Sequence, residues 1–258
     1  MKTQYGIQLY SVRDRTDKDM AGTLRDLAGM GYAMVEFAGF FGISAADIKR
    51  MLEETGLKIS GTHTGLRELL DDYSGTVAYH QAIGNKHYII PGHDLSDQAK
   101  IDDFVREVNR LLPLLKKEGI YLGYHNHSHE FIANADGSMI YDQLRAKTDL
   151  TLQLDTFWAY AAKRDPLQLM DELKDRLTFI HLKDGFQDGK GVPLGQGTAP
   201  VKAVHDKALR TLDWRGFTDE ELSLLPAFLT IGGDGASYDI GFGAMSRILA
   251  SDTPIHVL

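Results

Sequence analysis

The sequence predicts an α/β fold made of one domain over residues 1–258, in which parallel strands alternate with helices and close into a (β/α)8 barrel. Three observations lead to this prediction. The length of 258 residues is typical of a single-domain barrel. Short β-branched or aromatic runs alternate with longer amphipathic stretches, which supply the long connections that parallel strands need. The first strand lacks the glycine-rich turn of a doubly wound nucleotide-binding sheet, because it runs into LYSVRDR.

Seven segments have the composition of buried strands. They are Tyr5–Val12, Tyr32–Ala38, Lys58–Thr62, Lys86–Pro91, Ile120–His125, Leu150–Asp155 and Thr178–Leu182. Several helices between them carry readable end signals. The signals are Asp17 before a helix that would stop at Gly31, Ser44 with Asp47 before a helix that would stop at Gly56, and Asp165 followed by Pro166 at a first turn.

The eighth strand is the least regular element of the predicted barrel. Trp214–Leu222 is polar for a buried strand, and Ala227–Ile231 is apolar but comes late in the chain. We therefore treat residues 209–258 as an irregular C-terminal segment of the same domain. An exposed last strand would also invite pairing with a second copy, as a homodimer.

Composition excludes several classes of protein. The formal net charge is −8 and no basic stripe is present, so we expect no nucleic-acid partner. The chain has no cysteine, which excludes disulfides and thiolate metal sites. The N-terminus is charged too early for a signal peptide, and no stretch reaches the roughly 18 apolar residues of a membrane span. These features predict a soluble, cytoplasmic protein without a membrane partner.

Titratable residues gather where the predicted strands end, which is where barrel enzymes place their catalytic groups. They are Glu36, His63, His93, the run His125, Asn126, His127, His129 and Glu130, then Asp155, and finally His181, Lys183 and Asp184. A single His63 or His93 would more often be structural, and His129 is expected in a surface loop. Groups from five or six strands at one end of a barrel instead indicate a site.

Two features of this set favour a metal. His125 and His127 are alternate residues of one strand and so point to the same side, into the barrel mouth. Asp155 follows a leucine-rich run, and a carboxylate is costly to bury there unless it is paired or binds a cation. Imidazole and carboxylate groups without thiols suit one divalent metal, and they do not distinguish Mn, Mg, Zn and Co.

The ordered motifs YHNHSHEF, LQLDTFW, FIHLKD and GVPLGQGT resemble the sugar phosphate isomerase/epimerase family, the xylose-isomerase-like TIM barrels. Relatives in this group include ketose epimerases, inosose dehydratases, dehydroshikimate dehydratases and endonuclease IV-type barrels. The resemblance runs from Tyr5 to about Leu209. Endonuclease activity is disfavoured by the negative charge.

The resemblance implies a metal held at the ends of strands five to eight by His125, Asp155, His181 and Glu221. Lys183 would lie beside the substrate, and His127 and Glu130 would face it. His125 stands where many relatives have a glutamate that also transfers protons in the epimerases, which favours one-base chemistry. For Glu221, either it is a ligand on a distorted strand, or the C-terminal segment departs from the family.

We therefore expect a metal-dependent isomerase or epimerase acting on a small sugar, keto-sugar or sugar phosphate. Glu130 or His127 would remove a proton next to a carbonyl, and Lys183 would stabilise the oxyanion. The remaining expected substrate contacts are Glu36, His63 and His93. A dehydratase or lyase acting on a keto-inositol or 3-keto-sugar is the alternative chemistry. A non-catalytic sugar-binding barrel with a disabled site is the alternative of another class.

Overall fold

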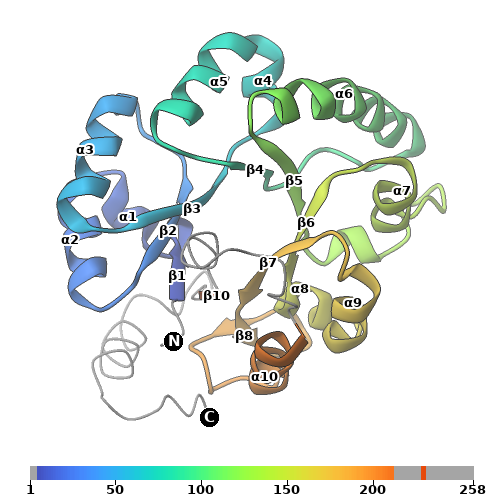
Figure 1. Ribbon diagram of the computed structural model, residues 1–258. Helices are drawn as coiled ribbons and strands as arrows, with labels where there is room; N and C mark the ends of the chain where they lie inside the picture. The colour runs from blue at the N-terminus through green and yellow to red at the C-terminus, as the bar shows by residue number, and fades with distance from the viewer. Residues whose placement is uncertain (1–4, 212–227, 231–258) are drawn as a thin grey trace.

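The computed structural model describes residues 5–211 and 228–230, which form a closed parallel barrel surrounded by helices (Figure 1). The strands follow one another around the barrel in the order β1-β10-β7-β6-β5-β4-β3-β2. Their bounds are Tyr5–Gln8 (β1), Met34–Ala38 (β2), Lys58–His63 (β3), His87–Ile90 (β4), Tyr121–His125 (β5), Thr151–Asp155 (β6), Leu177–Leu182 (β7) and Phe228–Thr230 (β10). The predicted fold class is confirmed.

The first strand is shorter than predicted. It ends at Gln8, and residues Leu9–Val12 form a 3-10 helix instead of continuing the strand. The cause is local, because the Gln8 side chain accepts a hydrogen bond from the backbone N–H of Tyr10 and so caps the turn. The prediction of a strand to Val12 is therefore wrong at its C-terminal half.

The eighth strand is β10, which pairs with β7 on one side and β1 on the other. It falls within the later of the two predicted segments, Ala227–Ile231. Leu229 of β10 is in register with His181 of β7 and with Gly6 of β1, and these pairings close the barrel. The other candidate, Trp214–Leu222, lies outside the described residues.

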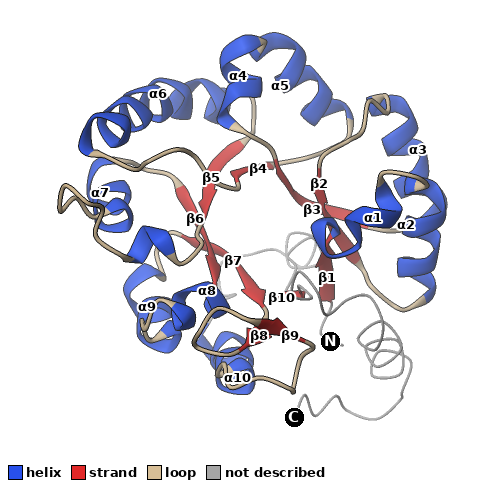
Figure 2. Cartoon of the chain, turned by 180° about the vertical axis from the view of Figure 1, so that it is seen from behind, coloured by secondary structure: helices blue, strands red, loops and turns tan. Residues whose placement is uncertain are grey.

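The helices form an outer ring around the strands, as both views show (Figures 1 and 2). Their bounds are Arg13–Thr16 (α1), Met20–Gly29 (α2), Ala45–Thr55 (α3), Leu66–Asp71 (α4), Tyr73–Ala82 (α5), Gln98–Lys117 (α6), Ile140–Lys147 (α7), Thr156–Ala161 (α8), Pro166–Leu173 (α9) and Val201–Thr211 (α10). A 3-10 turn spans His129–Phe131, and a small antiparallel pair joins Asp184–Gly185 (β8) to Gly191–Val192 (β9). None of these helices is long and apolar enough to cross a membrane.

Most predicted helix ends are confirmed. Ser44 accepts from the backbone N–H of Asp47, and Gly56 closes α3 with a positive φ of 70°. Asp165 caps α9 with Pro166 in its first turn. The prediction for α2 is wrong by two residues, because Asp19, and not Asp17, caps that helix through Gly22 N.

The alternation of side chains along each strand positions the site. On β2, Val35 and Phe37 pack in the core under the helices, so the intervening Glu36 faces the barrel interior. The same rule holds on β6 and β7, where the core residues are Leu152, Leu154, Ile180 and Leu182. The intervening side chains therefore point inward and meet at the C-terminal end of the barrel; they are Gln153, Asp155, His181 and Lys183.

Candidate active site

A pocket of about 420 Å³ opens at the C-terminal ends of the strands, a volume that suits a small-molecule ligand. Polar side chains from five strand ends reach it, together with an aromatic wall. Its lining residues are Gln8, Tyr10, Ala38, Gly39, His63, Pro91, His125, His127, Asp155, Trp158 and Lys183. The lining thus contains five of the ten residues predicted for the site.

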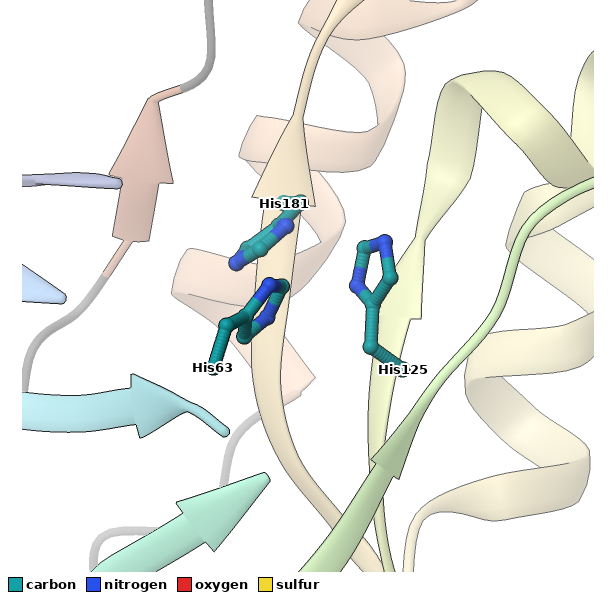
Figure 3. Close-up of side chains that lie close together, drawn as sticks. All are labelled: His63, His125 and His181. Carbon is teal, nitrogen blue, oxygen red and sulfur yellow. The ribbon is translucent and has the colours of Figure 1, made fainter. Parts of the chain in front are cut away.

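Three histidines from β3, β5 and β7 converge at the base of the pocket (Figure 3). Their ring centroids are 4.7 Å apart for His63 and His125, 4.8 Å for His125 and His181, and 5.5 Å for His63 and His181. One nitrogen of each ring lies within 4.8 Å of the others, so the rings offer ligand atoms at a spacing that a metal ion could bridge.

Burial favours the neutral form of the three histidines. It lowers the pKa of His181 to about 3 and holds that of His125 well below its usual range. The pKa of His63 is also lowered by burial, partly against the attraction of Glu36. Neutral imidazole is the form that binds a metal, because the lone pair must be free of a proton.

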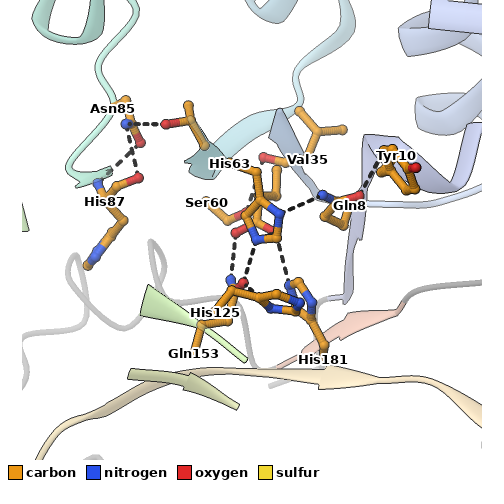
Figure 4. A network of polar contacts seen from close by, with 12 residues as sticks. Gln8, Tyr10, Val35, Ser60, His63, Asn85, His87, His125, Gln153 and His181 are labelled. Carbon is orange, nitrogen blue, oxygen red and sulfur yellow. Dashed lines mark hydrogen bonds and ion pairs between the residues drawn. The ribbon is translucent and has the colours of Figure 1, made fainter. Parts of the chain in front are cut away.

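Glu36 lies beneath the histidines and is fully buried. One carboxylate oxygen accepts from Gln153 Nε2 at 2.6 Å, and the other accepts from His181 Nε2 at 2.9 Å. His63 Nε2 lies 3.3 Å from the same second oxygen. Figure 4 shows His63, His125, Gln153 and His181 gathered in this polar network. Burial raises the pKa of Glu36, while His63 and Gln153 oppose that rise. Glu36 was predicted as a substrate contact, but here both of its oxygens face protein groups.

Asp155 ends β6 and starts α8, where its Oδ1 accepts from the backbone N–H of Trp158 at 3.0 Å. Burial raises the pKa of the carboxyl group, and electrostatic interactions with Lys183 and His181 oppose the rise. Lys183 itself is buried with its Nζ 4.2 Å from the ring centre of Trp158 and 5.2 Å from that of Phe157. A cation and a carboxylate therefore share one wall of the pocket.

The profile of the xylose isomerase-like TIM barrel family matches residues 24–223. This chain belongs to that family. Among solved structures, it is similar to a sugar phosphate isomerase/epimerase from Parabacteroides distasonis, with a TM-score of 0.75 and 23% identity over 97% of this chain and 93% of that one. No curated protein sequence matches the chain.

Two more distant solved structures share the fold. The probable 3-DHS dehydratase AsbF of Bacillus anthracis has a TM-score of 0.70 at 12% identity, covering 97% of this chain and 100% of that chain. The IOLI protein, whose crystal structure contains a zinc atom, has a TM-score of 0.66 at 13% identity, covering 95% and 94%. The same barrel fold is thus found in a sugar phosphate isomerase/epimerase and in a probable dehydratase.

The donor set of this family member fits a divalent metal. His181 Nδ1 is buried and has no hydrogen-bond partner among residues 5–211 and 228–230, which is costly for a polar atom unless something binds it. His181 also donates from its other nitrogen to a carboxylate, which is the usual support of a metal-binding histidine. Imidazole and carboxylate ligands without thiolates suit several divalent metals.

Glu130 and His127 follow β5, but only His127 lines the pocket. Glu130 is fully buried; its Oε1 accepts from Tyr124 Oη at 2.9 Å, and its Oε2 accepts from the backbone N–H of His127 at 2.8 Å. His129 Nε2 lies 3.2 Å from Glu130 Oε1. Burial raises the pKa of Glu130. Glu130 thus supports the loop that carries His127.

Among the described residues, His93 is predicted for the site but lies apart from it. His93 is exposed and packs its ring 5.0 Å from that of Phe104, outside the pocket lining. Glu221 lies outside the described residues. In contrast, Gln8 and Gln153 belong to the site and were not predicted. Gln153 stands two positions before Asp155 on the same strand face, so the strand alternation could have identified it.

Proposed function

We propose that this chain is a divalent-metal-dependent enzyme that transfers a proton next to the carbonyl group of a small sugar, keto-sugar or sugar phosphate. The observation that carries the proposal is an open pocket lined by His125, His127, Asp155 and Lys183, with the buried His181 ring 4.8 Å from that of His125. Membership of the xylose isomerase-like family and the similarity to a sugar phosphate isomerase/epimerase support the same class of reaction.

The metal would be held by His125, His181 and Asp155. These are the ligands implied by the family resemblance that lie within the described part of the chain. When bound, the metal would supply a Lewis acid that polarises the carbonyl or a neighbouring hydroxyl group. His63 and Glu36 lie behind this set, in contact with one another at 3.3 Å. Their place in the site is to support the ligands.

His127 is the residue we assign to proton transfer. Its ring lies 4.9 Å from that of His125 and 5.9 Å from that of Trp158, on the pocket wall. An imidazole can accept a proton from carbon near neutral pH and return it to the neighbouring carbon. Lys183 stabilises the negative charge that develops on the carbonyl oxygen, because its ammonium group lies in a buried position where charge interactions are strong.

The first step is the same for a dehydratase, which would then lose a β-substituent where an isomerase reprotonates. His125 in place of a glutamate leaves His127 to act as a single base, and one base suffices for elimination. Similarity in fold to the probable dehydratase from Bacillus anthracis supports dehydration as the second candidate function. The products distinguish the two.

The decisive experiment measures metal content by plasma mass spectrometry and then proton exchange in D2O. Protein purified without chelator and supplied with Mn²⁺ is incubated with ketohexoses and 3-keto-sugars, with and without a phosphate group. Deuterium at the carbon next to the carbonyl supports proton abstraction, whether isomerisation or elimination follows. No bound metal and no exchange with any substrate would overturn the proposal and favour the non-catalytic barrel.

Variants of the two proposed catalytic groups sharpen this test. We expect His127→Gln to lower the exchange rate about 100-fold or more, the typical contribution of a general base. We expect Lys183→Met to lower it about 100-fold or more while metal stoichiometry is kept, because an oxyanion-stabilising group acts on the transition state. Lys117→Met, at the exposed end of α6, removes the same charge far from the pocket and serves as the control.

A further inference from the structure

We infer that a chain of hydrogen bonds through Gln8, His63, Gln153 and Glu36 fixes which nitrogen of each site histidine carries the proton. It leaves a free lone pair on His125 and on His181, whereas the lone pair of His63 accepts a hydrogen bond from Gln8. Gln153 is the positioning residue at its centre. The part of this inference that concerns metal binding rests on the proposed function. The proton positions themselves are a property of the metal-free protein.

The assignment starts from a backbone group whose role is unambiguous. The N–H of Tyr10 can only donate, and it donates to Gln8 Oε1 at 2.6 Å. The amide nitrogen of Gln8 therefore faces His63 Nδ1, at 3.0 Å. An amide NH2 group only donates, so His63 Nδ1 accepts. A neutral imidazole that accepts at Nδ1 carries its proton on Nε2.

The next link runs through Gln153. His63 Nε2 lies 2.6 Å from Gln153 Oε1 and, carrying the proton, donates to it. The same oxygen lies 3.0 Å from His125 Nδ1. A carbonyl oxygen only accepts, so His125 Nδ1 also carries its proton. The lone pair of His125 is therefore on Nε2, which remains available to a ligand.

The last link reaches β7. With its oxygen turned to the histidines, Gln153 presents its Nε2 to Glu36 Oε1 at 2.6 Å and donates there. Glu36 Oε2 accepts from His181 Nε2 at 2.9 Å, which places the lone pair of His181 on Nδ1. This is the buried nitrogen that has no hydrogen-bond partner within the described part of the chain.

The consequence is that proximity alone misassigns the ligand set. His63, His125 and His181 all lie close enough to share a metal. However, both nitrogens of His63 are already engaged, one as acceptor from Gln8 and one as donor to Gln153. His63 is thus a connector that transmits the orientation of Gln8 to Gln153, while His125 Nε2 and His181 Nδ1 are the ligand atoms.

Proton positions are measured on metal-free protein labelled with ¹⁵N-histidine, by long-range ¹H–¹⁵N correlation, with single His→Gln variants used for assignment. We expect the proton on Nε2 in His63 and His181 and on Nδ1 in His125. A proton on Nδ1 of His63, or on Nε2 of His125, would overturn the assignment. The proton positions are read from the spectrum of the parent protein, and the variants serve only to assign its signals.

Calorimetric titration with Mn²⁺ tests the metal-binding part. We expect His125→Gln and His181→Gln to abolish stoichiometric binding and His63→Gln to retain it. We expect Gln153→Met to weaken binding about 10- to 100-fold, as is typical when the support of a ligand is removed, and to mix the His63 and His125 tautomers. Gln143→Met, which disrupts the distant Gln98–Gln143 pair on α6 and α7, should leave both readouts unchanged.

The two proposals fail in different ways. Loss of stoichiometric binding in His63→Gln, equal to that in His125→Gln, would overturn the exclusion of His63 from the ligand set. A parent protein that shows the expected tautomers but binds neither Mn²⁺, Co²⁺ nor Zn²⁺ would overturn the proposed metal-dependent function and still support the hydrogen-bond assignment.

Discussion

His181 Nε2 lies 2.9 Å from Glu36 Oε2, although 145 residues separate them in the chain. The pair joins β7 to β2 across the barrel interior, and both side chains are fully buried. A buried carboxylate behind a histidine orients the ring and increases the basicity of its other nitrogen. This contact thus connects the fold of the barrel to the chemistry of its open end.

The first prediction concerns that contact. Glutamine at position 36 keeps the size of the side chain but replaces one acceptor by a donor, so either Gln153 or His181 then faces an NH2 group. We expect Glu36→Gln to weaken Mn²⁺ binding about 10- to 100-fold, measured by calorimetric titration. Glu54→Gln, which disrupts only an exposed ion pair with Arg50, is the control. Equal affinity in Glu36→Gln and the parent would contradict the supporting role of Glu36.

The second prediction separates two roles of Asp155. Asparagine keeps an oxygen that can cap α8 but removes the charge, whereas alanine removes both. We expect metal binding to be lost in both variants, with the free energy of unfolding lowered only in Asp155→Ala, by about 1 kcal/mol, the usual value of an N-cap. Asp165→Ala, at the corresponding position of α9, should lower stability similarly but keep the metal. Chemical denaturation and metal analysis measure the two effects.

The third prediction concerns the loop after β7. The buried Asp184 carboxylate accepts from the backbone N–H groups of Gly185, Gly195 and Gly197 and holds this loop beside Lys183. A Cβ at Gly197 would lie 2.2 Å from Asp184 Oδ1 and within 2.6 Å of the Gly185 backbone. We expect Gly197→Ala to destabilise the protein by about 1–3 kcal/mol, as overpacking does.

A matched glycine provides the control for this prediction. At Gly92 an added Cβ would meet nothing within 4 Å, and its φ is not in the left-handed region. We expect Gly92→Ala to change the free energy of unfolding by no more than about 0.5 kcal/mol. Similar thermal unfolding of the two variants would show that the loop tolerates a methyl group, and the packing argument would fail.

The fourth prediction concerns acid stability. Burial lowers the pKa of both His80 and His87 from 6.5 to about 4, so each is neutral in the folded protein but binds a proton when unfolded below pH 6.5. The stability that these residues contribute is therefore present above pH 6.5 and lost as the pH falls towards 4. Each should reduce the free energy of unfolding by about 1.4 kcal/mol per pH unit in that window.

Removing one of these groups tests the sign. His87 Nδ1 is buried without a hydrogen-bond partner among the described residues, and its ring contacts Phe179 and Tyr121. We expect His87→Leu to flatten the pH dependence of urea unfolding between pH 6.5 and 4. Leu114→Ala, at an exposed position of α6, removes no titratable group and should leave the slope unchanged. An unaltered slope in His87→Leu would mean that His87 does not titrate on unfolding in this range.

The sequence by itself determined the barrel fold and the set of polar residues at the C-terminal ends of its strands. Alternating strand patterns and helix caps such as Ser44 and Asp165 act locally, so they can be identified without knowing any long-range contact. The period of two along each strand also turned Asp155, His181 and Lys183 inward. These residues are therefore predictable as a group, together with the family they indicate.

Only the tertiary structure determined which of those residues reach the site and which hydrogen bonds orient them. His63 is the last residue of β3, whereas His93 lies beyond the end of β4 and packs on Phe104 at the surface. The strand period no longer sets side-chain direction once the strand has ended. The hydrogen bonds of Gln8 and Gln153 join four strands that are distant in the chain. Directional contacts of this kind depend on barrel register, with β10 completing the ring between β7 and β1, and that register is fixed only when all strands pack together.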